Sequence, residues 1–347
     1  MESNPVVSIV VCHHTGTLLG GFLESVTYSS EVPYEIIVVT DKPKYTWCSN
    51  PTFYFEHVER NPMITWVDSN AMPARKRNRG AKVAKGKYLA FFDDDVTIEP
   101  DCLKVYVSFM EANPHVGMAY GKLYNMEHRT RLDEAGGYLT WNGFIWSRAE
   151  QNIVDDGRYD KAEPILAGKS ASCIMRKDIF DKVGGFDEEF GILGEETDLS
   201  WRVWLQGHSV YFVPDAVGYH AFNTRFKPVT EFYTSERVHR NGPRNYIALL
   251  VKNLGREHLW IIPIHVAIWT FVGLAMIGTG KWRAGKLIMF GVWDAILLLP
   301  KTLRKRLTVQ STRCLGEKEL FKLVFRKRGL DYYWVRFCRY LEIGLHG

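Results

Sequence analysis

The sequence predicts an α/β fold built on a mostly parallel sheet, followed by a helical C-terminal region. In the first hundred residues, compact apolar runs alternate with segments of helical character, the pattern of consecutive βαβ units. The run at residues 88–92 has the length of a buried strand and is followed directly by three aspartates. From residue 258 onward, long apolar and basic aromatic segments replace the alternation and indicate a separate region.

The expected elements follow in chain order. Strands are expected at residues 6–11, 35–39 and 88–92, with a short strand at 65–67. Helices are expected between them, at residues 18–28 and 74–84. Residues 115–225 are richer in glycine and aromatic side chains and less periodic, and the sequence contains no internal repeat.

Two common phosphate-binding motifs are missing from the sequence. No GxGxxG follows the first predicted strand, so a dinucleotide fingerprint is excluded. Residues 167–170, Ala-Gly-Lys-Ser, imitate the end of a P-loop, but Glu163 stands where that motif requires its first glycine.

Composition favours a cytosolic protein with a basic tail. Residues 301–347 carry 12 Lys and Arg against 4 Asp and Glu, whereas the rest of the chain carries 32 against 35. This distribution favours a surface anchor and excludes a nucleic-acid partner, because a nucleic-acid groove would make the body basic too. Six cysteines without a CxxC pattern, and an N-terminus without an evident signal peptide, predict reduced thiols in a cytosolic setting.

The C-terminal region is expected to contact a membrane. Residues 258–279 are long enough to span a bilayer, whereas residues 287–300 are short and contain Asp294. Basic residues at 281–286 and again at 301–306 conflict with the positive-inside rule for a spanning hairpin. Helices that lie in one leaflet are therefore preferred over a hairpin or a soluble helical domain. Residues 319–341 mix aromatic and basic side chains, which predicts an interfacial helix on anionic lipid, with a helix packed on the body as the alternative.

The three aspartates after residue 92 form the first candidate site. Carboxylates at the carboxyl end of a buried strand lie where open α/β sheets bind ligands. Asp93, Asp94 and Asp95 repel one another unless a cation lies among them, and such hard ligands suit Mg2+ or Mn2+, which favour phosphates. By itself the triplet is equally compatible with a metal–diphosphate site and a solvated acidic turn.

A second acidic cluster begins the helix expected over residues 199–205. Glu195 and Glu196 point along different faces, so that one can be structural while the other acts as a general base in a cleft. Asp198 and Arg202 are four residues apart and can pair on the helix. His220 follows, although an isolated histidine is more often a surface or core residue than a ligand.

In order and spacing, these pieces resemble the family 2 glycosyltransferases, which are inverting enzymes with the GT-A fold. Residues 7–11 and 35–39 look like the first two strands of that family's nucleotide-binding half, and residues 74–80 resemble its "ARN-G" helix. Residues 88–95 resemble the strand that ends in the DxD motif, and residues 184–188 with 195–202 resemble the "GGFDE … EDxDLxxR" signature. The resemblance runs from residue 7 to about residue 253, and residues 136–138 and 244–245 suggest the rhamnosyltransferase-like branch.

The resemblance implies a donor site at the aspartates. Asp93 and Asp95, completed by His220, would hold Mg2+ or Mn2+ against the diphosphate of a UDP-, dTDP- or GDP-linked sugar. Asp93 and Asp94 are also assigned to the nucleotide, and Arg77 is expected to meet phosphate, with a solvated basic face as the alternative for the helix that carries Arg75, Arg77 and Arg79.

The same resemblance implies the roles of the remaining site residues. The family's base-reading aspartate is replaced by Thr40, with Asp41 next, so both positions are assigned to the nucleotide base. Glu196, with Glu195 as second choice, would accept the proton of the acceptor hydroxyl in a single inverting displacement. Trp141 and Trp146 are expected either to stack on a sugar or to belong to the core.

Residues 1–250 are therefore expected to form the GT-A domain, with a nucleotide half at 1–120 and an acceptor half at 121–250. Residues 251–347 would form the membrane-associating region, on the cytoplasmic face of the cell membrane. The expected enzyme moves a hexose or deoxyhexose to a glycan or lipid-linked acceptor in polysaccharide biosynthesis. The alternatives are a nucleotidyltransferase, which the missing glycine-rich loop disfavours, and an inactive glycan- or lipid-binding scaffold.

Overall fold

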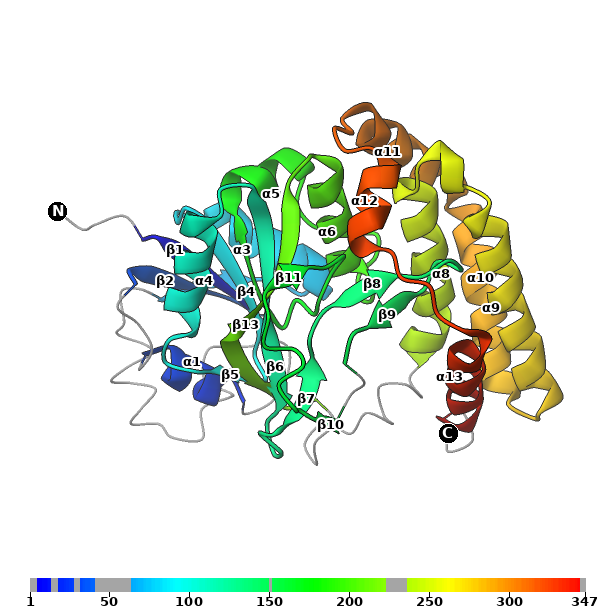
Figure 1. Ribbon diagram of the computed structural model, residues 1–347, viewed down its shortest axis with the longest axis horizontal. Coiled ribbons are helices and arrows are strands. Elements are labelled where there is room, and N and C mark those ends of the chain that lie inside the picture. The colour runs from blue at the N-terminus through cyan, green and yellow to red at the C-terminus, as the bar shows by residue number, and fades with distance from the viewer. Residues whose placement is uncertain are drawn as a thin grey trace.

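A mixed, 11-stranded sheet forms the centre of the described chain in the computed structural model, which describes residues 5–13, 18–27, 32–40, 64–149, 152–222 and 236–343 (Figure 1). Its first half is parallel: β1 (Val7–His13) lies between β2 (Tyr34–Thr40) and β4 (Tyr88–Asp93), and β3 (Ile64–Asp68) follows β2. All four strands confirm the sequence prediction, with ends that differ by at most two residues.

The second half of the sheet is mixed in direction. β12 (Ser172–Arg176) runs antiparallel between β4 and β6 (Val116–Asn125), while β13 (Ser209–His220) runs parallel to β6 and antiparallel to β5 (Val96–Ile98). Short strands complete the edges: β7 (Arg131–Glu134), β10 (Ile153–Val154) and β11 (Glu163–Pro164). This order brings the end of β4 close to the ends of β7 and β13.

A small hairpin stands beside the large sheet. β8 (Gly137–Leu139) and β9 (Ile145–Ser147) pair only with each other as strands, and an isolated bridge from Gly137 to Ala167 connects them to the body. Trp141 and Trp146 belong to this hairpin. Trp146 stacks on Tyr138, and Trp141 meets Tyr333 edge-on, so both rings pack within the protein and remain partly exposed.

Helices cover both faces of the sheet because its central strands are apolar on both sides. α1 (Leu19–Thr27) and α4 (Cys102–Ala112) pack on the face that carries Tyr88, Ala90 and Phe92. The opposite face, with Leu89 and Phe91, is covered by α3 (Pro73–Val83), α5 (Lys177–Val183) and α6 (Glu195–Leu205). The helices predicted at 18–28 and 74–84 are confirmed as α1 and α3.

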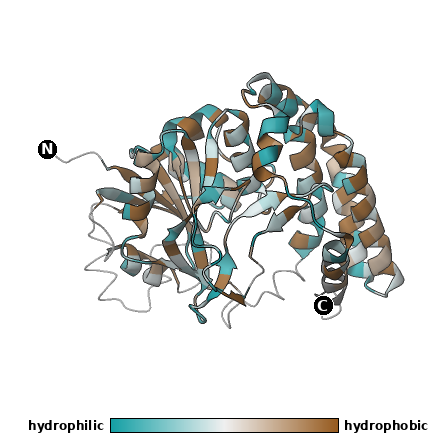
Figure 2. Cartoon of the chain, viewed as in Figure 1, coloured by the Kyte–Doolittle hydropathy of each residue, from teal (hydrophilic) through white to brown (hydrophobic). Residues whose placement is uncertain are grey.

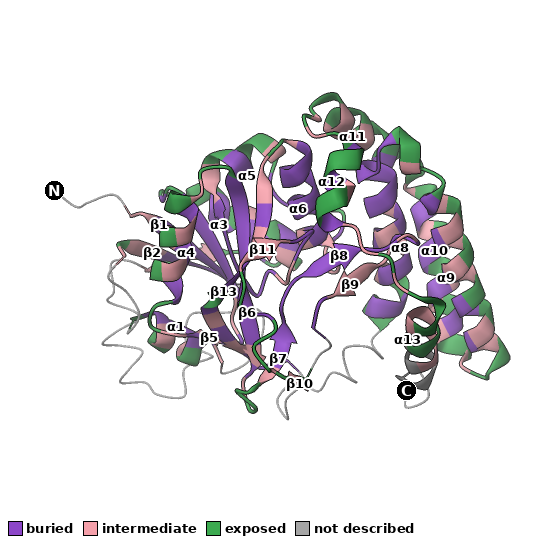
Figure 3. Ribbon diagram, in the orientation of Figure 1, coloured by how far each residue is buried: buried purple, intermediate pink, exposed green. Residues whose placement is uncertain are grey.

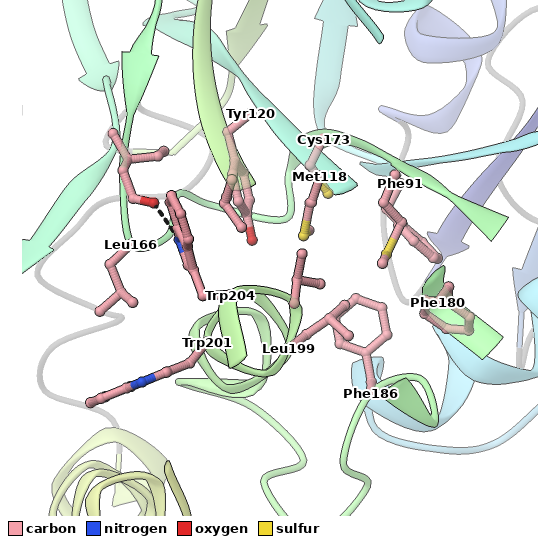
Figure 4. Packing of buried hydrophobic residues seen from close by; sticks show 14 of the residues in the cluster. Phe91, Met118, Tyr120, Leu166, Cys173, Phe180, Phe186, Leu199, Trp201 and Trp204 are labelled. Carbon is pink, nitrogen blue, oxygen red and sulfur yellow. Dashed lines mark hydrogen bonds between the residues drawn. The ribbon is translucent and has the colours of Figure 1, made fainter. Parts of the chain in front are cut away.

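Close packing fixes α3 and α6 against the sheet. A Cβ atom at Gly80 would lie 2.4 Å from Cγ1 of Val10, so that only glycine allows α3 its approach to β1. Trp201 and Trp204 of α6 are buried with Leu199, and the dashed line in Figure 4 marks the Trp204 indole N–H, which donates to the Ile165 carbonyl at 2.9 Å. The N-termini of both helices, where the candidate site residues begin, are therefore held rigidly.

The C-terminal helices form a layer beside the sheet, at the right of Figure 1. They are α8 (Glu236–Asn253), the short 3-10 helix η2 (Arg256–His258), α9 (Ile261–Gly278), α10 (Trp282–Leu297), α11 (Leu299–Ser311), α12 (Glu317–Val324) and α13 (Leu330–Ile343). α8, α9 and α10 share their own core, which includes Val251, Trp269, Met276 and Ile288. The predicted domain boundary at residue 250 falls inside α8.

Within the described residues, α9 is the helix that is long and apolar enough to cross a membrane, and a third of it is buried. Its apolar character and its partly exposed surface are visible in Figures 2 and 3. His265 ties α9 to the hairpin: it accepts from the Trp269 indole N–H at 2.9 Å, so its other ring N–H donates to the Asn142 carbonyl at 2.8 Å. Burial lowers the pKa of His265 to about 4, which keeps the ring neutral.

Two predictions about the C-terminal region differ from the structure. The apolar stretch at 287–300 is divided between α10 and α11. The helix expected at 319–341 is two helices, because the intervening chain is held against the hairpin: the Arg326 N–H donates to the Leu139 carbonyl at 2.9 Å, next to a bridge between Leu139 and Phe325. The five cysteines in the described part of the chain are free thiols, as expected.

Candidate active site

The aspartate triplet and His220 meet at one edge of the sheet. Asp93 ends β4, Asp95 lies in the turn before β5, and His220 ends β13, which pairs with β5 at Val96. One ligand atom from each of Asp93, Asp95 and His220 can be chosen so that all three lie within 4.8 Å of one another. The structure thus brings together the three residues predicted to hold the metal.

Asp133, at the end of β7, orients His220. It accepts from Nδ1 of His220 at 2.8 Å and from the ammonium of Lys169 at 2.7 Å. Nε2 of His220 then faces Oδ1 of Asp95 at 3.3 Å and, among the described residues, makes no hydrogen bond of its own. A histidine whose far nitrogen is fixed by a carboxylate is the usual form of a metal-ligating histidine. The donor set of two carboxylates and one imidazole fits Mn2+ or Mg2+.

The charge around His220 supports the same fit. Burial disfavours the protonated ring, yet the carboxylates of Asp95 and Asp133 outweigh burial and raise the pKa of His220 to about 9. Without a metal, the carboxylates are therefore balanced by a proton on His220. A divalent cation held by Asp93, Asp95 and His220 would supply the balancing positive charge instead.

Arg77 connects the aspartate site with the second acidic cluster. Its guanidinium donates through Nη2 to Oδ1 of Asp93 at 2.8 Å and through Nη1 to Oε1 of Glu195 at 3.0 Å. Its side chain is only 4% exposed, whereas that of Arg75 is 56% exposed. Burial lowers the pKa of Arg77, but the nearby Asp93 and other groups raise it more, so the guanidinium stays charged. Lys76 and Arg77 are the buried cations of this helix, and Arg77 is the one that faces these two carboxylates.

Glu195 and Glu196 have different surroundings at the start of α6. Glu195 is buried and bound to Arg77, whereas Glu196 is partly exposed. Burial, followed by the adjacent charge of Glu195, raises the pKa of Glu196 well above the usual value for a glutamate. A partly exposed carboxylate with a raised pKa is suited to accept a proton.

The loop before α6 is held by Asn245 of α8, a role that the sequence did not reveal. The side-chain amide of Asn245 donates to three backbone carbonyls, those of Phe190, Ile192 and Leu193, at 2.8–2.9 Å. Within this loop Gly191, Leu193 and Gly194 have positive φ angles of 65°, 74° and 84°. The strained turn that aims Glu195 and Glu196 is therefore stabilised from the C-terminal helical layer.

Asn78 fixes the segment at residues 184–188 in a similar way. Its side chain accepts from the Phe186 N–H at 2.9 Å and donates to the Phe186 carbonyl at 2.8 Å. Arg75, one turn earlier, pairs with Glu188 at 2.8 Å. The two sequence segments that resembled family motifs are thus in direct contact, and α3 holds both this segment and Glu195.

Asp198 anchors α6 on its buried side. It pairs with Arg202 at 2.7 Å, as the four-residue spacing predicted, and accepts from Lys252 and Asn253 of α8 at 2.9 Å each. Burial raises the pKa of Asp198, but the cations outweigh burial and lower it overall. Asp198 therefore connects α6 to α8 and is fully buried.

The residues assigned to the nucleotide lie around the end of β1. Thr40 is buried at the end of β2, and Asp41 lies outside the described residues. Asp94 is paired with Nδ1 of His13 at 2.7 Å, and Lys76 donates to the His13 carbonyl at 2.6 Å.

The mixed sheet, with a candidate metal site at the end of β4 and an acidic pair at the start of α6, has the arrangement of the GT-A glycosyltransferase fold. The chain resembles the structure of GalNAc-T7 with UDP, GalNAc and Mn2+, at a TM-score of 0.54 and 16% identity, over 73% of this chain and 48% of that one. It also resembles the mannosyltransferase PcManGT from Pyrobaculum calidifontis with GDP-Man and Mn2+, at a TM-score of 0.51 and 16% identity, over 90% and 85% of the two chains. Both neighbours hold a nucleotide or nucleotide-sugar with a divalent metal, in agreement with the predicted cofactors.

The sequence assigns the family directly. Residues 55–254 match the profile described as "Glycosyltransferase like family 2", and the chain belongs to this family. It is 31% identical over 150 residues to the O-antigen biosynthesis protein RfbC of Myxococcus xanthus, of which it covers 12%. It is 23% identical over 223 residues to an uncharacterized glycosyltransferase of Haemophilus influenzae, of which it covers 70%. The prediction of a family 2 glycosyltransferase is confirmed.

Proposed function

We propose that this glycosyltransferase is a metal-dependent, inverting enzyme that moves a hexose or deoxyhexose from a nucleotide-diphospho-sugar to a glycan or lipid-linked acceptor. The observation that carries the proposal is the position of Arg77, whose guanidinium joins Asp93 of the candidate metal site to Glu195 beside Glu196. The residues suited to hold the leaving diphosphate therefore lie next to Glu196, which is suited to accept the proton of the attacking hydroxyl.

Asp93, Asp95 and His220 would hold the cation, with Asp133 fixing the imidazole. When bound, the cation would neutralise the charge that builds on the leaving diphosphate. The occurrence of UDP or GDP-Man with Mn2+ in structures of the same fold supports this choice of donor. Because Arg77 bridges two carboxylates, its proposed role is to set their separation.

Glu196 is the proposed general base. Its raised pKa and partial exposure suit it to take the proton of an acceptor hydroxyl as that oxygen attacks the anomeric carbon. The nucleoside diphosphate leaves from the opposite side, and one displacement inverts the anomeric configuration. Glu195 is occupied by Arg77, which makes it a positioning residue in this proposal.

We also propose that the enzyme works at the cytoplasmic face of a membrane. Exposed apolar side chains on α9, α10 and α13, including Phe271, Leu274, Phe290 and Trp334, support this location, together with the basic charge of residues 301–347. Fractionation without detergent tests it: full-length protein found only in the soluble fraction would contradict it.

Screening nucleotide sugars for Mn2+-dependent thermal stabilisation, followed by measurement of donor hydrolysis and product configuration, tests the catalytic proposal. We expect one donor to stabilise the wild type, and we expect Asp95→Ala to abolish that Mn2+-dependent shift. Glu196→Gln should retain the shift and lower turnover by about 10²–10⁴-fold. Conversion of the nucleotide sugar and added inorganic diphosphate into a nucleoside triphosphate and a sugar 1-phosphate would instead indicate a nucleotidyltransferase. Retained turnover in Glu196→Gln would contradict the assignment of the base.

A further inference from the structure

An open cavity lies between the segment that precedes α6 and the helices α8 and α11. Its empty volume is about 370 Å³, part of it continuous with solvent, and its lining includes Phe190, Asn245, Ala248 and Leu298. The charged lining side chains are four cations and two carboxylates: Arg244, Lys252, Lys301, Lys305, Asp187 and Glu189. The cavity is not used by any of the catalytic groups described above.

The cations that line this cavity outnumber the carboxylates that line it. Asp187 is shared between Lys252, at 2.7 Å, and Lys305, while Glu189 pairs with Lys301 at 2.7 Å. Lys252 also pairs with Asp198, which Arg202 shares. Arg244 forms no salt bridge among the described residues and donates instead to the carbonyls of Glu189 and Phe190 and to Asn245. The cavity therefore carries excess positive charge in a partly desolvated setting, which favours an anion.

An apolar surface borders the same cavity. Leu298 lines it, and the neighbouring α10 ends in exposed side chains: Trp293 is 57%, Ile296 is 51% and Leu297 is 61% exposed. A basic cavity that opens beside an exposed apolar stripe matches a ligand with an anionic head and a hydrocarbon tail. Neither a free glycan nor a nucleotide has this combination.

The cavity is also connected to the proposed base. Glu189 and Phe190 begin the loop that continues directly into Glu195 and Glu196, and Asn245 holds both this loop and one wall of the cavity. A ligand in the cavity would thus contact the segment that leads into the proposed base.

We propose that this cavity binds the phosphate or diphosphate group of a lipid-linked acceptor, whose hydrocarbon tail lies along the exposed face of α10. The inference rests on the proposed function, because it names the acceptor class of the same site. Arg244, Lys301 and Lys305 supply the cations, and Trp293, Ile296 and Leu297 supply the contact for the tail.

Calorimetric titration of the full chain in EDTA tests the proposal, since diphosphate cannot be held by the aspartate site without its metal. The probes are farnesyl diphosphate and inorganic pyrophosphate. We expect both to bind, and farnesyl diphosphate to bind at least about tenfold more tightly because of its tail. Absence of metal-free binding would overturn the proposal. Equal affinity for the two probes would assign the cavity to free diphosphate and overturn the lipid part.

Lys301→Glu and Lys318→Glu form a matched pair of variants. Each lowers the charge of the C-terminal region by two, and both side chains are exposed, at 56% and 81%, but only Lys301 lines the cavity. We expect Lys301→Glu to weaken farnesyl diphosphate binding by about tenfold or more, and Lys318→Glu to leave it unchanged. Lys301→Ala, which adds no repulsion toward Glu189, should weaken it less. Equal losses of affinity in Lys301→Glu and Lys318→Glu would show that the overall positive charge attracts the probe, and would contradict binding in a defined cavity.

These results separate the inference from the proposed function. Mn2+-dependent donor hydrolysis does not require an acceptor, so in the wild type it tests the enzyme proposal independently of the cavity. Loss of donor hydrolysis in the wild type would contradict the enzyme proposal and leave metal-free diphosphate binding measurable. Normal hydrolysis without metal-free binding would contradict the cavity alone.

Discussion

The side-chain amide of Asn245 donates to the backbone carbonyl of Leu193 at 2.8 Å, and Leu193 has a φ angle of 74°. A left-handed backbone is costly for a leucine, and it is maintained here by a residue from a helix 52 positions away in the sequence. Because Leu193 lies two residues before Glu195, the geometry of the proposed catalytic helix depends on α8.

Replacement of Asn245 should therefore affect turnover more than donor binding. We expect Asn245→Ala to destabilise the protein by about 1–3 kcal/mol. We also expect it to lower kcat by about 10–100-fold, with little change in the donor KM, because the loop would no longer aim the base. Urea unfolding and steady-state kinetics measure the two effects.

Asn245→Asp is the matched control for this prediction. Aspartate has the shape of asparagine but cannot donate to the three carbonyls. The Asp variant should be at least as impaired as the Ala variant if donation is what matters. Normal kcat in Asn245→Asp would assign the residue to packing alone.

Arg77 and Arg75 provide a second matched pair on one helix. Arg77→Ala leaves the buried Glu195 and the partly buried Asp93 without their shared cation, and we expect a loss of about 3–5 kcal/mol in unfolding free energy, mainly from Glu195. Arg75→Ala removes an exposed pair with Glu188 and should cost less than about 1 kcal/mol. Denaturant titrations of both variants in one buffer make the comparison. Equal losses would mean that Arg77 is not the structural link between the two clusters.

Asp133 is expected to set metal affinity without touching the metal. In Asp133→Asn, Nδ1 of His220 loses its carboxylate partner, and Mn2+ affinity should fall about 10–100-fold. Titration of Mn2+ followed by electron paramagnetic resonance measures the change. Asp156→Asn, at an exposed carboxylate paired with Arg158, is the control and should bind Mn2+ normally. If Asp133→Asn bound Mn2+ with unchanged affinity, this would contradict the role of Asp133 in orienting His220.

Asp198 predicts a specific dependence of stability on acid. Although burial opposes ionisation, Arg202 and Lys252 lower the pKa of Asp198 in the folded protein, whereas in the unfolded chain it is about 3.9. The stability that this shift contributes is fully present above the pKa of Asp198 in the unfolded chain. It is lost as the pH falls below that value and through the lower pKa of Asp198 in the folded protein. Asp198→Asn should therefore be less stable than the wild type at pH 6, and its stability should fall less between pH 6 and pH 3. Parallel pH profiles of urea unfolding for the two proteins would contradict this.

The sequence predicted those features that depend on local pattern. The apolar run at residues 88–92 could only be a buried strand with carboxylates at its end, and the spacing of Asp198 and Arg202 determined their pair. Motif order then placed Glu195 and Glu196 opposite the aspartates. The sequence pattern could not predict contacts between distant segments, such as the contact of Arg77 with Glu195, which are 118 residues apart.

Asp133 and Asn245 were missed for the same physical reason. Each acts through another residue, and nothing in the surrounding sequence marks a carboxylate that will orient His220 or an amide that will hold a loop. The C-terminal helices were anticipated from composition, but the division at residues 325–329 depends on pairing with Leu139, which only the folded chain brings into reach.

The hairpin of β8 and β9 has a consequence for how such enzymes diversify. Among the described residues its strands pair with no strand of the large sheet, so its partly exposed side chains can change without shifting the register of β4, β6 or β12, although Tyr138 and Leu139 belong to the main core. Arg77, Asn78 and Glu195, by contrast, are constrained by one another. Over evolutionary time, replacements are therefore expected to accumulate at the partly exposed positions of the hairpin, such as Trp141 and Ile145, while the spacing of the reacting groups is inherited unchanged.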